Sequence, residues 1–214
     1  MKLADRTLES FLDELGSASP APGGGSAAAL AGAAAAALCA MVCRLTIGRE
    51  AYREAWPEAE TALAESRKLE ARFRGLVDED AEAYLAVVAA RALPRETPAQ
   101  KETRKAAIQR AVVHAAEAPL ATLDALRKCV GIVVLVAEKG NTSCRTDAGS
   151  AGALCRAGAL AASYNVRVNL PSVADQSLRA SLSDRAREAL AGVQAAADRI
   201  AHLLEDTLGE GSSS

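Results

Sequence analysis

Aromatic residues are scarce in this chain. They make up 3% of the 214 residues, although 50% of the sequence is hydrophobic. Alanine supplies most of the difference, and the alternating β-branched and aromatic runs typical of strands are missing. Because alanine, leucine, glutamate and arginine are good helix formers, the composition predicts an all-α protein. The length suffices for one domain with a sizeable core.

Cysteine and histidine are also few, and they are not grouped as metal ligands. The 5 cysteines and 2 histidines include no Cys-x-x-Cys pair, so no metal site is expected. An odd number of scattered cysteines is typical of reduced thiols. The N-terminal MKLADRTLES lacks the apolar core of a signal peptide. We therefore expect a cytoplasmic protein.

The chain also has no excess of positive charge. The formal net charge is −2, and no basic stretch is interleaved with aromatic residues, so nucleic-acid binding is not expected. The uncharged run 27–43 is short for a membrane span and consists mostly of alanine. We interpret this run as a buried helix and expect no membrane partner.

Turn and capping residues divide the chain into helices. The expected helices span residues 8–15, 26–47, 57–93, 97–117, 120–138, 147–163 and 172–208. Thr97, Pro98 and Gln100 have the order of an N-cap, a first-turn proline and a capping-box partner, whereas Pro119 is expected to break or kink its helix. We predict a single-domain bundle of about six to seven long helices over residues 1–209, with a disordered tail at 210–214.

A glycine cluster stands before the alanine-rich helix. The PGGGS motif places Gly23, Gly24 and Gly25 directly before Ser26. Because glycine has no side chain, an anionic ligand can come close to the backbone N–H groups at the N-terminus of the helix. The motif is not a P-loop, because no Lys-Ser/Thr pair follows and no strand precedes it. In the structural alternative, Ser26 caps the helix and the glycines form a turn.

A carboxylate interrupts an apolar helix face in LVDEDAEAY. Helical periodicity puts Asp80 on one face with Leu69, Phe73, Leu76, Val77, Tyr84 and Val88. Asp78 is expected on the polar side, beside Glu82. A carboxylate in an apolar stripe is unfavourable unless it is paired or has a raised pKa, and such groups concentrate at functional sites. The alternative is a buried aspartate satisfied by an arginine or a helix terminus.

A third polar group follows Gly140. Asn141 and Asp147 precede or begin a small-residue helix, and Asn165 and Asn169 are expected after it. Asparagine offers donors and acceptors without charge, which suits recognition of an amide-like heterocycle. In the alternative, Asp147 is an N-cap and the asparagines occupy turns.

Four stretches, in this order, carry a family resemblance: FLDELGSASPAPGGGSAAAL, LVDEDAEAYLAVVAARALP, KETRKAAIQRAVVHAAEAPL, and GNTSCRTDAGSAGALCRAG with NVRVNL. They resemble the cyclodeaminase domain of formiminotransferase-cyclodeaminase and its stand-alone bacterial relatives, some of which are methenyltetrahydrofolate cyclohydrolases. The resemblance covers residues 5–207 and does not include a transferase domain. It implies an all-helical homodimer, a folate site near the subunit interface, and a separate formiminotransferase as a further partner.

The resemblance also assigns roles by position. It implies catalytic roles for the carboxylates Asp80, Asp78 and Asp147. It implies substrate binding by Gly23, Gly24, Gly25, Ser26, Asn141, Asn165 and Asn169. Cys144 and Arg145 depart from the small polar residues of relatives in that loop.

The implied reaction is cyclising deamination of 5-formimino-tetrahydrofolate to 5,10-methenyl-tetrahydrofolate and ammonia. One carboxyl group would act first as base and then as acid. The alternative is hydrolysis of the methenyl compound to 10-formyl-tetrahydrofolate, and neither reaction requires a tightly bound cofactor. A hypothesis of another class is a non-catalytic helical protein whose glycines and alanines form a tight dimer.

Overall fold

The computed structural model of the chain describes residues 2–210, with side chains for residues 2–205. This part of the chain is helical and contains no strand, which confirms the predicted all-α class. The long helices are α1 (Leu8–Leu15), α2 (Gly24–Thr46), α3 (Trp56–Ala92), α4 (Pro98–Lys139), α5 (Arg145–Asn169) and α6 (Gln176–Glu210). Short 3-10 helices are η1 (Leu3–Asp5), η2 (Glu50–Ala55), η3 (Thr142–Cys144) and η4 (Leu170–Ser172).

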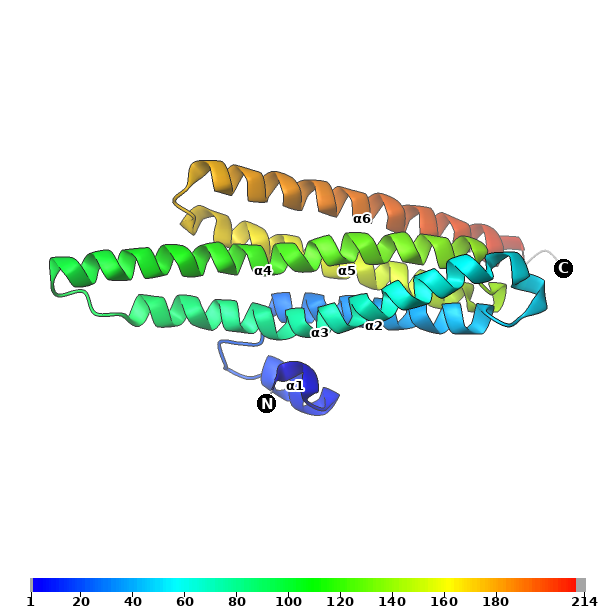
Figure 1. Ribbon diagram of the computed structural model, residues 1–214, viewed down its shortest axis with the longest axis horizontal. Coiled ribbons are helices and arrows are strands. Elements are labelled where there is room, and N and C mark those ends of the chain that lie inside the picture. Colours follow the sequence, from blue (N-terminus) through cyan, green and yellow to red (C-terminus); the bar gives the residue numbers. More distant parts are fainter. Residues whose placement is uncertain (1, 211–214) are drawn as a thin grey trace.

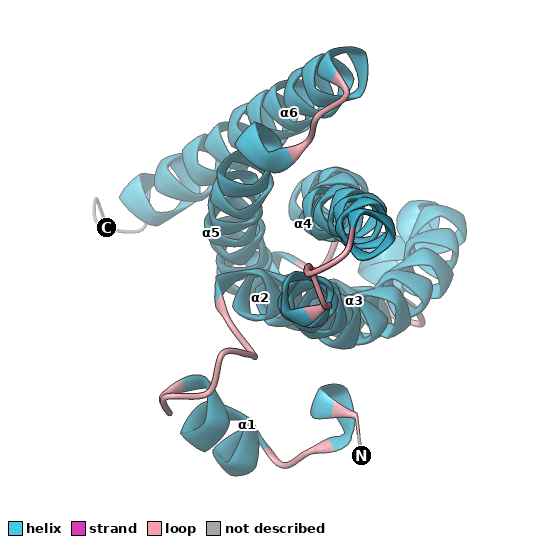
Figure 2. Cartoon of the chain, turned by 90° about the vertical axis from the view of Figure 1, so that its left-hand side faces the viewer, coloured by secondary structure: helices cyan, strands magenta, loops and turns pink. Residues whose placement is uncertain are grey.

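Helices α2 to α6 form an elongated bundle in which consecutive helices run in opposite directions (Figure 1). Helix α2 packs against α3, α4 and α5, and α6 packs against α4 and α5. Seen along the bundle, α6 and α1 lie on opposite sides of it (Figure 2). The hairpin of α3 and α4 extends beyond the other helices at one end (Figure 1).

Helix α2 contributes many small residues to the core of the bundle. Its completely buried hydrophobic residues are Ala29, Ala35, Ala36, Cys39, Val42 and Cys43. Within the described chain, α2 is the helix that is long and apolar enough to cross a membrane. Its contacts with three other helices and its buried alanines instead favour the interpretation as a core helix.

One glycine of α2 allows α3 to approach closely. The fully buried ring of Phe73 occupies the space beside Gly32, so a Cβ atom at position 32 would lie 2.5 Å from a ring carbon. Any larger residue at this position would therefore displace Phe73 from the core.

The two ends of α4 follow the predicted signals. Thr97 Oγ1 accepts from the Gln100 N–H at 3.2 Å, and Gln100 Oε1 accepts from the Thr97 N–H at 3.0 Å, which confirms the capping box. Gly140 ends the helix as predicted. The two helices expected on either side of Pro119 are, however, one continuous helix with this proline inside it.

The end of α5 differs from the expectation. The helix continues to Asn169 rather than ending near residue 163, so Asn165 and Asn169 are helical and do not occupy turns. Asn165 Nδ2 donates to the Ala161 carbonyl at 2.9 Å, and Asn169 Nδ2 donates to the Asn165 carbonyl at 2.8 Å. Each side chain thus donates to a carbonyl of its own helix and does not compete with the backbone hydrogen bonds of α5.

Helix α6 begins later than expected. Asp175 Oδ1 accepts from the Leu178 N–H at 3.0 Å, so this aspartate, and not Ser172, caps the helix. Glu210, which was assigned to the disordered tail, is the last residue of α6. The rest of the predicted tail, residues 211–214, lies outside the described residues.

All five cysteines are free and buried. Cys39, Cys129 and Cys155 come from three different helices, and Cys129 is the hydrogen-bond partner of the other two in the core. Burial raises the pKa of the Cys43 thiol to about 11, so this thiol stays protonated at neutral pH.

We expect Gly32→Ala to lower the free energy of unfolding by up to about 2 kcal/mol. Overpacking against Phe73 costs about 1–3 kcal/mol, which exceeds the gain in helix propensity of about 1 kcal/mol. The matched control is Gly131→Ala in α4, where a Cβ atom would have no neighbour within 4 Å. The control should raise stability by up to about 1 kcal/mol. Urea denaturation measures the free energy of unfolding of both variants. Changes of the same sign in the two variants would contradict the packing argument.

Candidate active site

A cavity of about 270 Å³ opens at the N-terminal end of α2, where this helix meets α3, α4 and α5. Its lining includes five predicted site residues and one aromatic ring, from Gly23, Gly24, Asp80, Tyr84, Asn165 and Asn169. Residues predicted from three separate stretches of the sequence therefore meet at one place in a single chain.

Ser26 connects α2 to the carboxylate in α3. It lies in the first turn of α2, and its hydroxyl is 2.9 Å from the Val77 carbonyl and 3.1 Å from Asp80 Oδ2. The N-cap of α2 is Gly23, which provides no side-chain hydrogen bond. The alternative in which Ser26 caps the helix is therefore wrong.

The three glycines of the PGGGS motif differ in how closely they are packed. A Cβ atom at Gly25 would lie 2.0 Å from Asp80 Oδ1, whereas one at Gly24 would lie 3.2 Å from Asn165 Nδ2. At Gly23 the added atom would have no neighbour within 4 Å. None of the three has a positive φ, so close approach of the neighbouring side chains, not turn geometry, explains the glycines at positions 24 and 25.

The carboxyl group of Asp80 is protonated more readily than an ordinary aspartate. Burial against α2 raises its pKa, and the hydroxyl and backbone N–H of Ser26 oppose this rise only in part. A carboxyl group beside a cavity can both accept and donate a proton, and a raised pKa makes its protonated form easier to populate.

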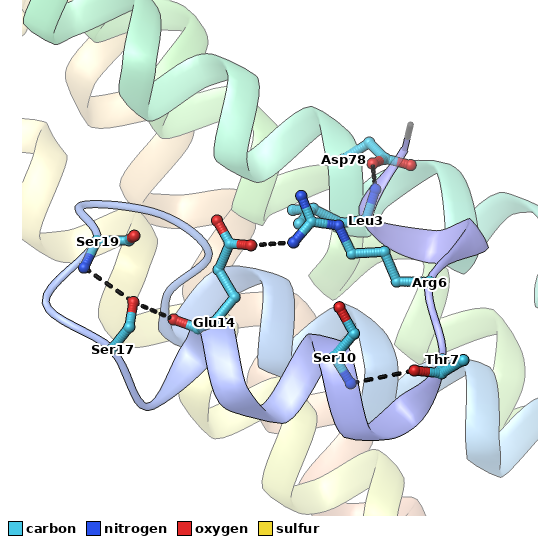
Figure 3. A network of polar contacts seen from close by, with 8 residues as sticks. All are labelled: Leu3, Arg6, Thr7, Ser10, Glu14, Ser17, Ser19 and Asp78. Carbon is cyan, nitrogen blue, oxygen red and sulfur yellow. Dashed lines mark hydrogen bonds and ion pairs between the residues drawn. The ribbon is translucent and has the colours of Figure 1, made fainter.

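Asp78 lies on a different face from Asp80. It is buried, and its Oδ1 accepts from the Leu3 N–H at 2.6 Å (Figure 3). The prediction that Asp78 occupies the polar side beside Glu82 is wrong, because η1 folds over this part of α3 and covers it. Glu82 itself is exposed. The segment that covers Asp78 also contains an ion pair between Arg6 and Glu14 (Figure 3).

The predicted apolar stripe of α3 is only partly correct. Phe73, Leu76 and Val77 are buried as expected, but Tyr84 and Val88 are about half exposed. Tyr84 contributes to the cavity instead of the core, and Arg91 adds a cationic side chain to the lining. The sequence analysis did not select Tyr84 or Arg91 for the site. Their signal is the spacing from Asp80 by one and three helical turns.

The remaining two predicted residues lie elsewhere. Asn141 is buried in the turn between α4 and α5, where its Oδ1 accepts from the Ser143 N–H and its Nδ2 donates to the Leu45 carbonyl, both at 3.1 Å. Asp147 belongs to the first turn of α5, whereas Asn165 is near the other end of this helix. Along an α-helix that separation is about 27 Å, so within one chain Asp147 and Asn141 do not line the cavity.

Metal ligands do not gather among the described residues. No group of three histidine, cysteine or acidic side chains in this part of the chain is placed to hold a metal ion.

Comparisons with known proteins agree with this arrangement. The family model described as Formiminotransferase-cyclodeaminase matches residues 7–188. The chain is 39% identical over 204 residues to a methenyltetrahydrofolate cyclohydrolase of Methylorubrum extorquens, covering 95% of this chain and 96% of that protein. It is 32% identical to the formimidoyltransferase-cyclodeaminase of Sus scrofa over 86% of this chain, but it spans only 34% of that longer protein. The crystal structure of formiminotetrahydrofolate cyclodeaminase from Thermotoga maritima is similar with a TM-score of 0.87 and 25% identity, over 97% of this chain and 100% of that one.

We expect Asp80→Asn to stabilise the fold at neutral pH. Because burial raises the pKa of Asp80, the folded state binds this proton more tightly than the unfolded chain. The wild type therefore loses stability relative to the variant as the pH rises from the unfolded pKa of about 3.9 through the raised folded pKa, and the difference stays constant above it. Melting temperatures between pH 4 and pH 8 measure this difference. Glu82→Gln controls for the loss of one exposed negative charge, and a variant less stable than wild type at pH 7 would contradict the burial argument.

Proposed function

We propose that this chain, which belongs to the formiminotransferase-cyclodeaminase family, is a one-carbon folate enzyme whose reaction takes place beside Asp80. The observation that carries the proposal is the half-buried carboxyl group of Asp80, with its raised pKa, at the edge of a cavity. The names of the relatives, which are cyclodeaminases and a cyclohydrolase, support a tetrahydrofolate derivative as substrate.

The first candidate reaction is cyclodeamination of 5-formimino-tetrahydrofolate. Nitrogen-10 attacks the carbon of the protonated formimino group, which forms the new C–N bond and leaves a proton on nitrogen-10. The Asp80 carboxylate takes that proton and then delivers it to the exocyclic amine. The bond to this amine breaks, ammonia leaves, and the methenyl cation remains. One carboxyl group thus acts in both directions, and it returns to its starting state.

The lining of the cavity suits the polar, flat head of a folate. Asn165 and Asn169 provide uncharged amide groups, and Tyr84 provides an aromatic face. The N-terminal turn of α2 adds backbone N–H groups where Gly23 and Gly24 have no side chain. At about 270 Å³ the cavity is at the small end for ligand sites, so we propose that the rest of the folate extends outside it.

The second candidate reaction is hydrolysis of methenyl-tetrahydrofolate. It is favoured by the 39% identity, over nearly the full length of both chains, to the Methylorubrum extorquens cyclohydrolase. In this reaction Asp80 takes a proton from the water that attacks the methenyl carbon. It then returns the proton to nitrogen-5 as the bond between nitrogen-5 and this carbon breaks, and the remaining hydroxyl proton leaves to solvent as the oxygen becomes the carbonyl of the 10-formyl compound.

We expect Asp80→Asn to lower kcat at least about 100-fold, the lower range for general acid–base catalysis. The variant keeps the shape of the side chain and an acceptor for Ser26, so binding of reduced folate should persist. The absorbance of methenyl-tetrahydrofolate measures turnover, and calorimetry measures binding.

The same assay distinguishes the candidate functions. Appearance of methenyl-tetrahydrofolate from the formimino compound identifies the deaminase, and its loss by hydrolysis identifies the cyclohydrolase. If neither changes and no reduced folate raises the melting temperature, the hypothesis of a non-catalytic helical protein replaces both. Near-normal turnover in Asp80→Asn would remove Asp80 from the mechanism.

We also propose that the protein acts as a homodimer, with the dimer interface beside the cavity. On α5, Leu160, Tyr164 and Val168 are exposed at a spacing of one helical turn, and Val168 is 71% exposed. On α3, Leu85 and Val88 continue from the cavity residue Tyr84 as a second exposed apolar strip. Apolar strips on both sides of a small cavity favour coverage by a second copy.

Tyr164→Glu should therefore convert the protein to a monomer at micromolar concentration, because it puts a charge into the proposed interface. Light scattering measures the mass. Leu45→Glu is the control, since Leu45 is also partly exposed but lies at the other end of α2. A wild-type protein that is itself monomeric at this concentration would contradict the homodimer.

The other predicted residues receive different proposed roles. We propose that Asp78 holds the N-terminal segment onto α3 and that Asn141 holds the turn before α5. Asp147 remains a catalytic candidate only in the homodimer, where a partner subunit can bring the start of its α5 to the cavity.

We further propose that the enzyme works in the cytoplasm, where its five free cysteines stay reduced, and receives the formimino compound from a separate formiminotransferase.

A further inference from the structure

Pro119 removes one hydrogen bond from the interior of α4. Proline has no backbone N–H, so the carbonyl four residues earlier, that of Ala115, loses its usual donor within the helix. Both residues are buried, and Ala115 borders the cavity. A buried carbonyl without a donor is unfavourable, so it requires a partner from outside α4.

That partner is Asn169 from the end of α5. Its Nδ2 lies 2.8 Å from the Ala115 carbonyl and 2.8 Å from the Asn165 carbonyl. The amide group has two hydrogens, and each is directed to one of these oxygens. Since both partners are acceptors, the side chain cannot turn over without placing its own oxygen against a carbonyl. The orientation of Asn169 is therefore fixed, and Oδ1 is the polar atom left for a ligand in the cavity.

We propose that Pro119 is a positioning residue, which acts through the Ala115 carbonyl to turn Asn169 so that its Oδ1 accepts an N–H of the substrate. The cavity then selects ligands with a hydrogen-bond donor at this point, such as the amino or ring N–H groups of a reduced pterin. Only the identity of the ligand rests on the proposed function. The link from Pro119 to Asn169 rests on the two hydrogen bonds that Asn169 donates.

An ordinary residue at position 119 would weaken this link. Its N–H would bond to the Ala115 carbonyl, as in a regular helix, so this oxygen would no longer require Asn169 as its donor and the bond from Asn169 would weaken. With mainly the Asn165 carbonyl left to hold it, the amide group of Asn169 would turn more readily and present its N–H groups to the cavity. An N–H donor of the substrate would then face an N–H donor of Asn169, so binding would weaken. At the same time α4 would become more regular.

The test is Pro119→Ala, for which stability and binding should change in opposite directions. We expect the variant to melt at the same or a higher temperature, because alanine is the better helix former. The KM for the folate substrate and the Kd for a stable reduced folate, 5-formyl-tetrahydrofolate, should both rise about tenfold, as for the loss of one well-placed hydrogen bond. The kcat should stay within about twofold, because Asp80 is unchanged. Gly131→Ala is the matched control, since it also raises the helix propensity of α4 but lies away from the cavity.

A double-mutant cycle shows whether Pro119 acts through Asn169. Asn169→Ala alone should raise KM by about the same factor, and Pro119→Ala should add little in that background. A full additional rise in KM, or Pro119→Ala with unchanged KM and Kd, would overturn the proposal.

A spectroscopic measurement keeps this test separate from the proposed function. In the wild type, the two Nδ2 protons of Asn169 should exchange slowly with water, and Pro119→Ala should make the exchange faster. Assignment of these NMR signals follows from their loss in Asn169→Ala. If no reduced folate binds the wild type, the proposed function fails, but the exchange rates still decide whether Pro119 positions Asn169. Equal exchange in wild type and Pro119→Ala would refute the positioning role.

Discussion

The close approach of α2 and α3 is the constraint on which both the core and the candidate site depend. Two side chains of α3, Phe73 and Asp80, lie directly against two glycines of α2, Gly32 and Gly25. Within each helix the two positions are seven residues apart, and the order is reversed between the helices, as antiparallel packing requires. One register thus buries an aromatic ring at one contact and a carboxyl group at the other. Of the PGGGS glycines, Gly25 belongs to this contact, whereas Gly24 lies beside Asn165 of α5.

Much of this arrangement could be predicted from the sequence, because its signals are local. The capping box at Thr97 and Gln100 and the stop at Gly140 depend on neighbouring residues only, and both were correct. The selection of Asp80 as a candidate followed from helical periodicity, and the structure places it beside the glycine motif and the two asparagines. The family resemblance brought these stretches together before their contacts were known.

What could not be predicted depends on contacts between distant parts of the chain. Asp78 is buried because the backbone of Leu3, 75 residues away in the sequence, covers it. Asn141 and Asp147 carry the same residue types as the site but lie at the other end of the bundle, a distinction that pattern and spacing do not contain. The helix that continues across Pro119 was predicted as two helices, because the compensating donor comes from another helix.

The alanine-rich centre of α2 also determines which sequence changes this fold can tolerate during evolution. An alanine side chain has no rotamers to lose, so this core is ordered at little side-chain entropy and has few atoms that can rearrange. In a core of leucine and phenylalanine, the damaging change is usually the loss of atoms, which leaves a cavity. At Gly32 the damaging change is instead the gain of a single methyl group, because the ring of Phe73 already occupies the space that this group would need. Sequence drift along this helix is therefore restricted mainly by size, and an exchange between hydrophobic residues that would be conservative elsewhere is disruptive here.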